Sequence, residues 1–142
     1  VVRGATVPVV IVPAAGASGG PIADLLVPLD GSTLAEAALP QAVTFARALD
    51  AELHLIRIVE PIRDAFFMYG SPMSLYLSDA QLTRLQEEAD SEANSYLATI
   101  ADSLANQPVR VTQTIRHGNP AQQLLRMTAD FPRKNRMQDQ TV

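Results

Sequence analysis

A run of five apolar residues, Leu25 to Leu29, ends abruptly in the polar sequence Asp30-Gly31-Ser32. An unbroken apolar run of this length, closed by turn residues, is typical of a strand covered on both faces in a parallel sheet. A helical pattern follows at once, and Ser32 or Thr33 can cap its first turn. A strand, a tight polar turn and a helix N-terminus together form a place where α/β folds bind ligands. The sequence therefore predicts one side of a ligand site at this turn.

Helical and strand patterns follow in alternation. Residues 33–49 carry apolar side chains at helical spacing, Thr33 and Glu36 have the spacing of a capping box, and Pro40 predicts a kink. Residues 51–61 form a second apolar strand, expected to be central in the sheet although His54 and Arg57 interrupt it.

A long helix is predicted from Asp79 to about residue 105, opened by a capping box at Ser78 and Gln81. We interpret its acidic group, which consists of Glu87, Glu88, Asp90 and Glu92, as a solvated face. Residues 109–116 alternate between apolar and polar side chains, as edge strands do. Asn119 and Pro120 then open a helix that fades near residue 130. This order predicts an α/β fold with a mainly parallel sheet and right-handed crossovers.

Composition narrows the range of functions. The chain of 142 residues is 47% hydrophobic, enough for one domain with a core. A net charge of −4 argues against a general nucleic-acid binder, and 5% aromatic residues argue against base-stacking platforms. The absence of cysteine excludes disulfides, thiolate metal sites and a cysteine nucleophile. No apolar run is long enough to span a bilayer. We expect a cytoplasmic protein that binds neither nucleic acid nor membranes.

Neither a catalytic nor a metal site is expected. Asp30, Ser32 and His117 are the residue types of a hydrolase triad, but they would lie at the ends of the first and third strands. Two strand spacings are about 10 Å, too far for a direct hydrogen bond. No nucleophile-elbow motif is present. His54 and His117 have no third ligand beside them, so no metal site is expected. Because neither a triad nor a metal site is expected, the sequence predicts a protein that is not an enzyme.

Three motifs resemble the universal stress protein (UspA-like) family. Val27–Ser32, followed by an alanine-rich helix, resembles the start of the family's domain. Residues 58–61 (Ile-Val-Glu-Pro) resemble the end of its second strand, and residues 118–121 (Gly-Asn-Pro-Ala) resemble the opening of its third helix. The motifs occur in the family's order and at its intervals, and the resemblance covers about residues 23–130.

The resemblance implies a doubly wound, mainly parallel sheet of order 3-2-1-4-5 between two layers of helices. Nucleotide-binding members of the family hold ATP at the carboxyl ends of strands 1 and 4, the topological switch point. Carried over by motif, Pro28 and Asp30 would lie against the adenosine, with Asp30 accepting hydrogen bonds from its sugar or base side. Ile58 would offer backbone contacts to adenine. A simpler role for Asp30 stays open, in which it only caps the following helix and interacts with its dipole.

The phosphate side of such a site is not expected in this chain. The family's glycine-rich signature follows its fourth strand, whereas Gly118 is the last glycine here. We therefore expect strands 4 and 5 of this copy to be missing and residues 131–142 to form a tail unlike the family. Residues 1–13 resemble the last strand of a preceding copy, and residues 14–22 read as a linker. Together these features indicate a tandem protein with a truncated second domain at residues 23–130.

A missing fourth strand would leave one edge of the first strand open. Two hypotheses fill the vacancy: pairing with Pro8–Val12, or pairing with another subunit. Two functions fit the whole pattern. One is a non-catalytic adenine-nucleotide-binding domain whose ATP site is incomplete. The other is a nucleotide-independent dimerisation or interaction module of the stress response, with a homodimer or tandem-domain partner.

Overall fold

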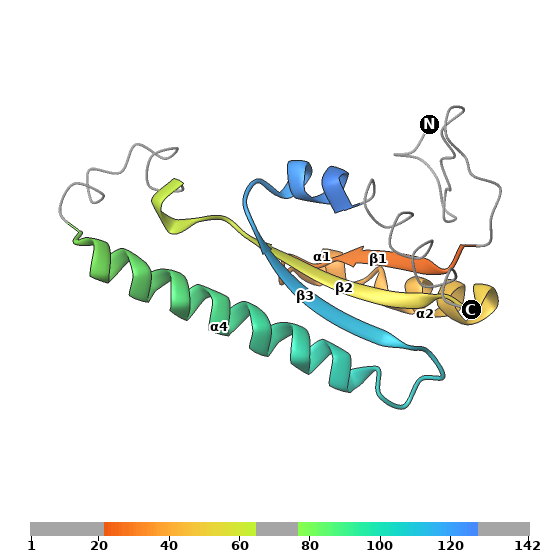
Figure 1. The fold of residues 1–142 in the computed structure, drawn as a ribbon. Helices are drawn as coiled ribbons and strands as arrows, with labels where there is room; N and C mark the ends of the chain where they lie inside the picture. The colour runs from red at the N-terminus through yellow and green to blue at the C-terminus, as the bar shows by residue number, and fades with distance from the viewer. Residues whose placement is uncertain (1–21, 65–76, 128–142) are drawn as a thin grey trace, which may run out of the picture.

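The structure, a computed structural model, describes residues 22–64 and 77–127 of the chain. Within these residues three parallel strands form one sheet in the spatial order β1-β2-β3 (Figure 1). The strands are β1 (Asp24–Pro28), β2 (Glu52–Val59) and β3 (Val111–His117). The predicted α/β class, the parallel sheet and the central position of the second strand are confirmed.

In the described ranges the helices are α1 (Thr33–Glu36), α2 (Leu39–Leu49) and α4 (Asp79–Ser103), and residues 62–64 and 120–127 are also helical. The prediction of one kinked helix over residues 33–49 is wrong, because α1 and α2 are separate. The amide of Ala38 bonds back to the Ala35 carbonyl over 3.1 Å, which tightens the turn and ends α1. Pro40 then lies in the first turn of α2, where a missing N–H needs no partner.

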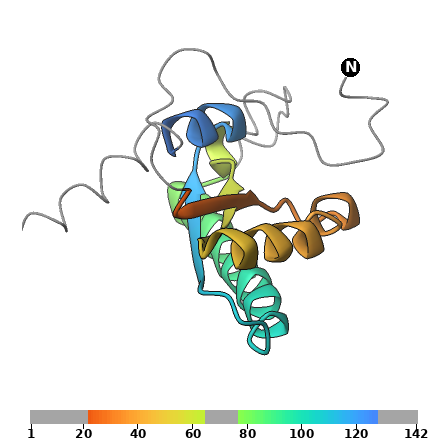
Figure 2. The same cartoon turned by 90° about the vertical axis from the view of Figure 1, so that its right-hand side faces the viewer.

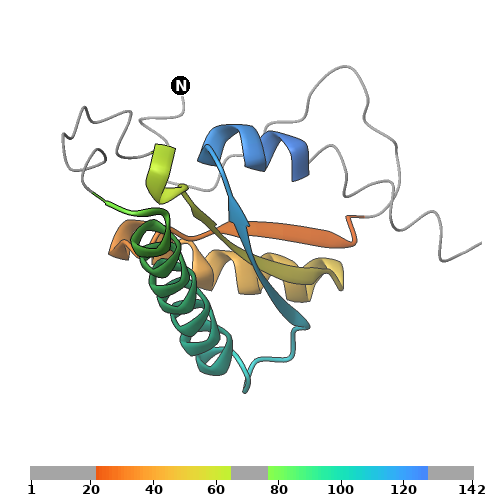
Figure 3. The same cartoon turned by 60° about the vertical axis from the view of Figure 1, so that its left-hand side comes forward.

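The helices lie on both sides of the sheet in the arrangement that right-handed crossovers require. The steps from β1 to β2 and from β2 to β3 go in the same direction, so α2 and α4 cover the same face. The helical residues 120–127 lie on the opposite side of the sheet in all three views (Figures 1, 2 and 3). In a doubly wound fold, the order in which strands are added to the sheet reverses partway along the chain, and the helices after the reversal cover the opposite face. The position of residues 120–127 is the one that such a fold gives to the helix after β3.

The core lies between the sheet and the α2–α4 layer. Leu53 and Leu55 of β2 are at most 1% exposed and pack with Leu97 of α4, which is fully buried. Burial along α4 is uneven, because Leu85 nearer its start is 37% exposed. At roughly 1.5–3 kcal/mol for each fully buried leucine, β2 and the second half of α4 stabilise the sheet most.

Side-chain caps fix where two helices begin. The Ser78 hydroxyl accepts from the Gln81 amide at 3.3 Å, and the Gln81 side chain accepts from the Ser78 amide at 2.9 Å. The predicted capping box of α4 is therefore confirmed. The Asn119 side chain likewise accepts from the Gln122 amide, which caps the helix at residues 120–127 as predicted. No helix in the described ranges is both long and apolar enough to cross a membrane.

Residues 1–21, 65–76 and 128–142 are outside the described part of the chain. The predicted strand at residues 1–13, nearly all of the linker and the predicted tail are therefore not tested. Among the described residues, β1 pairs with β2 along one edge and no strand pairs with its other edge. This is the edge that the sequence predicted to be open, and its proposed pairing with Pro8–Val12 also concerns residues outside the described ranges.

Candidate functional site

The three residues assigned to a ligand site by motif gather at one edge of the sheet. Parallel strands end at the same edge of a sheet, so Pro28, at the end of β1, lies near the last residues of β2. Pro28 pairs with Ile56 in register, and Ile58 lies two residues further along the same strand. Pro28 and Ile58 therefore point to the face of the sheet away from α2 and α4. Asp30 follows β1 directly, at the same edge.

The Asp30 turn is a closed hydrogen-bonded structure. One Asp30 carboxylate oxygen (Oδ1) accepts from the Ser32 amide at 2.9 Å, which is an Asx turn. Gly31, with φ of 86°, supplies the left-handed residue that the turn requires. The Ser32 hydroxyl accepts from the Ala35 amide at 3.1 Å and so caps α1. Ser32 caps this helix and Asp30 does not, so the capping role considered for Asp30 is wrong.

The Asp30 carboxyl is fully exposed and held in its charged form. Hydrogen bonds from the Ser32 side chain and backbone, together with the nearby positive charge of Arg57, lower the pKa of Asp30 below its usual value of 3.8. A carboxylate has about four acceptor positions, and the turn uses only part of them. Asp30 can therefore accept further hydrogen bonds from a ligand at neutral pH.

A cation and a phenol lie beside this turn. The Arg57 guanidinium lies over the Tyr96 ring, 5.1 Å from its centroid. The Tyr96 hydroxyl donates to the Glu36 carboxylate at 2.9 Å. Partial burial and the Glu36 charge raise the pKa of Tyr96 to about 12. The predicted capping box of Thr33 and Glu36 is wrong, because Ser32 is the N-cap of α1 and the Glu36 carboxylate instead bonds to Tyr96 on α4.

Sequence reasoning missed this Arg57–Tyr96–Glu36 group, although a signal was present. Arg57 alternates with Leu53 and Leu55, which places a charged side chain on the core face of β2. A charge on such a face needs a partner from the covering helix. Tyr96 lies on that helix, but no local pattern in the sequence linked the two residues.

His117 is held by α4 and is not part of a triad with Asp30. Its ring nitrogen Nε2 lies 2.8 and 2.9 Å from the two Asp90 carboxylate oxygens. Gln86 donates to Asp90 and accepts from the Ile62 amide, each at 2.9 Å. Burial alone would raise the pKa of Asp90, but hydrogen bonds from His117 and Gln86 lower it overall. The interpretation of Asp90 as part of a purely solvated face is therefore wrong.

Asp24, His54 and Thr112 form an aspartate–histidine–hydroxyl group across the sheet. His54 Nε2 lies 2.8 Å from an Asp24 carboxylate oxygen, and His54 Nδ1 lies 2.6 Å from the Thr112 hydroxyl. The three residues come from β1, β2 and β3 in turn, so the contacts link all three strands. This agrees with a structural role for His54. No group of three or more histidine and carboxylate side chains in residues 22–64 and 77–127 could hold a metal ion.

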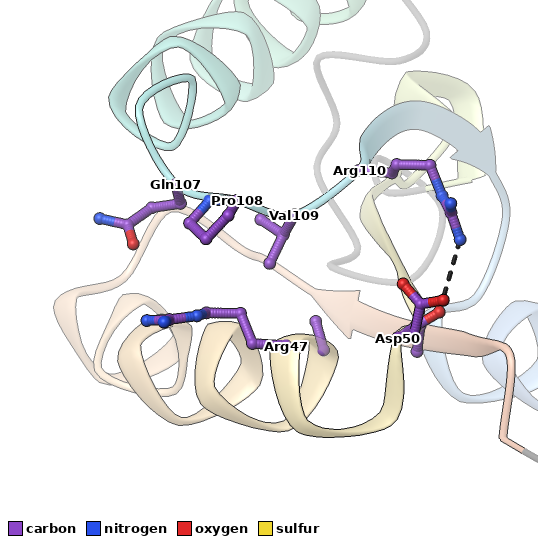
Figure 4. Close-up of a pocket in the computed structure, with 8 residues that line it drawn as sticks. Arg47, Asp50, Gln107, Pro108, Val109 and Arg110 are labelled. Atoms are coloured by element: carbon purple, nitrogen blue, oxygen red, sulfur yellow. Dashed lines mark hydrogen bonds between the residues drawn. The ribbon is translucent and has the colours of Figure 1, made fainter.

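Two of the cavities lined by described residues lie on the α2 side of the sheet. One, of about 550 Å³, opens where α2 and the α4–β3 connection meet (Figure 4). At one end of it Arg110 bonds to the Asp50 carbonyl oxygen at 3.4 Å, and Arg47 and Gln107 lie at the other end. The second, of about 540 Å³, lies between α2 and α4. Neither cavity is lined by Pro28, Asp30 or Ile58.

Comparisons with known proteins agree on the fold. The model of the universal stress protein family matches residues 22–131. The structure is similar to the universal stress protein UspA from Lactobacillus plantarum, with 21% identity, a TM-score of 0.62, and coverage of 80% of this chain and 72% of that chain. It is also similar to a universal stress family protein from Burkholderia pseudomallei, with 18% identity, a TM-score of 0.59, and coverage of 78% and 75%. At these identities the structures show the shared fold alone. No curated protein matches the chain.

Proposed function

This chain belongs to the universal stress protein family, and from that premise we propose that it is a non-catalytic domain that binds an adenine nucleotide through Pro28, Asp30 and Ile58. The adenosine would lie at the carboxyl edge of the sheet, beyond the end of β1. ATP is the nucleotide that the family resemblance suggests.

The observation that carries the proposal is the Asp30 turn. Its carboxylate is exposed, ionised and fixed by Ser32, with acceptor positions left for donors of a ligand. Fixing an acceptor before binding avoids part of the ordering cost of association. Ribose hydroxyls and the adenine amino group are donors of the kind that such a carboxylate accepts.

Pro28 and Ile58 suit the apolar parts of the same ligand. Pro28 is exposed at the end of β1, and Ile58 is half-buried near the end of β2. An apolar wall with one fixed polar group is the usual composition of a small-molecule site. In this arrangement Asp30 would orient the nucleoside, and Pro28 and Ile58 would exclude water from the base and sugar.

Titration calorimetry with ATP tests the proposal. We expect saturable binding that Asp30→Ala abolishes or weakens by tenfold or more, since a hydrogen bond to a charged group contributes about 1.5–3 kcal/mol. Asp102→Ala is a matched control, because Asp102 is an exposed carboxylate near the end of α4. Equal affinities for Asp30→Ala and the unchanged protein would overturn the assignment of Asp30.

A second function, association without a nucleotide, is favoured by a different observation. Leu34 on α1 is 84% exposed, and no described strand covers the outer edge of β1. Exposed apolar side chains and open strand edges are both places where chains associate. Sedimentation equilibrium tests this: a dimer that Leu34→Glu dissociates, with ATP making no difference, would support it. A monomer at all concentrations would exclude it.

A further inference from the structure

The Arg57–Tyr96–Glu36 group beside the Asp30 turn indicates a further residue that acts on this site. We infer that Arg57 is a positioning residue, whose guanidinium, stacked on Tyr96, supports the Asp30-Gly31-Ser32 turn and keeps Asp30 in its ligand-binding position. The inference rests on the proposed function in that it concerns the same site, but its central evidence is the geometry of the ligand-free turn.

The guanidinium of Arg57 contacts the turn directly at its glycine. A Cβ atom placed on Gly31 would lie 2.7 Å from Arg57 Nη1 and 3.6 Å from Arg57 Cζ. Real Cβ atoms do not approach other atoms that closely, so the space that a side chain would take at Gly31 is filled by the guanidinium. The φ of 86° itself favours glycine here, and a side chain at Gly31 would also displace the end of the Arg57 side chain.

Tyr96 of α4 also contacts the guanidinium. The ring lies 5.1 Å from Arg57 Cζ, within the range of a cation–π contact. The ring is itself oriented, because its hydroxyl donates to Glu36 on α1 at 2.9 Å. Arg57 is thus held between a helix of the core layer and the backbone of the turn, and the Tyr96–Glu36 bond links that helix to the element that follows the turn.

A flat guanidinium suits this position better than an ammonium group would. It stacks on an aromatic ring with one face and leaves its edge for neighbouring groups, whereas lysine carries a compact, strongly hydrated charge. Arg57 also lies close enough to Asp30 for its charge to act on that carboxylate. The side chain therefore supports the turn both by contact and by charge.

Nuclear magnetic resonance of the ligand-free protein tests the inference. In Arg57→Met the Asp30 carboxyl should titrate at a higher pH, and the Ser32 amide should lose the shift caused by its hydrogen bond. Affinity for ATP should fall several-fold. Arg57→Lys, which keeps the charge without the flat group, should lie between Arg57→Met and the unchanged protein, and it remains informative if Arg57→Met does not fold.

Arg84→Met is the matched control, since Arg84 is exposed on α4 and pairs only with Glu88 among the ion pairs of the described residues. It should leave the Asp30 titration unchanged. A double-mutant cycle between Gly31→Ala and Arg57→Met is a second, independent test. Gly31→Ala should lower the melting temperature less in the Arg57→Met background, because the new Cβ atom no longer clashes with the Arg57 guanidinium.

The outcomes separate the two claims. Unchanged Asp30 titration and Ser32 amide shift in Arg57→Met, with additive effects in the cycle, would overturn the positioning role of Arg57. Absence of ATP binding in the unchanged protein would overturn the proposed function, while the ligand-free spectra would still decide the role of Arg57.

Discussion

Replacing three leucines by alanine, one at a time, tests how α4 lies on the sheet. Leu97 on α4 is fully buried, Leu85 on the same helix is 37% exposed, and Leu34 on α1 is 84% exposed. Each substitution removes the same three side-chain carbon atoms. The cost in folding free energy should therefore follow burial.

The expected magnitudes come from the buried fraction of each side chain. Leucine to alanine removes three carbons, about 2.4 kcal/mol when fully buried. Scaled by burial, the cost is about 1.5 kcal/mol at Leu85 and about 0.4 kcal/mol at Leu34. At Leu97 the surrounding core leaves a cavity, which brings the cost to about 3 kcal/mol or more.

Urea unfolding followed by far-ultraviolet circular dichroism measures these costs. The midpoint should fall most for Leu97→Ala, less for Leu85→Ala and hardly at all for Leu34→Ala, with similar slopes for all three. A Leu34→Ala cost equal to that of Leu97→Ala would refute the packing of α4 described above, or would show that α1 is covered by another chain.

Three further predictions concern single contacts. Ser78→Ala should cost about 1 kcal/mol in thermal or urea unfolding because it removes the cap of α4, whereas Ser95→Ala, exposed in mid-helix, should cost little; equal costs would contradict the capping box. The Asp90 pKa is lowered on folding, so its contribution to stability is present above pH 3.8, its usual value, and is lost as the pH falls through the lower folded value. The difference in melting temperature between the unchanged protein and Asp90→Asn should shrink over that range, and a constant difference would refute the pairing with His117. The Tyr96 phenol should ionise at about pH 12 in an ultraviolet titration, and Glu36→Gln should move that ionisation to lower pH; no movement would exclude the Glu36 contact as a cause.

Local sequence signals predicted much of the fold. The apolar run of β1, the capping box at Ser78 and Gln81, and the Asn119 cap each depend on residues a few positions apart. Such patterns are legible in a single sequence. The order of the sheet came from the family resemblance, and right-handed crossovers account for the helices lying where they do.

Contacts between distant residues could not be predicted in the same way. The Arg57–Tyr96 stack and the His117–Asp90 pair form only when α4 lies on the sheet in one register. No pattern within the helix shows which residues of β2 or β3 it meets. The break between α1 and α2 was misjudged for a related reason: Pro40 can kink a helix or open a new one, and the cap at Ser32 and the turn at Ala38 favour the second.

The placement of the ligand is tested most directly by following backbone amide resonances of the unchanged protein during titration with ATP. If the Asp30 turn binds ATP, the shifts should concentrate at Leu29, Asp30, Gly31 and Ile58, at the carboxyl edge of the sheet. Amides that line the cavity in Figure 4, such as those of Arg47 and Arg110, should stay unchanged. Shifts confined to that cavity, or none at saturating ATP, would contradict the proposal that the Asp30 turn is the binding site.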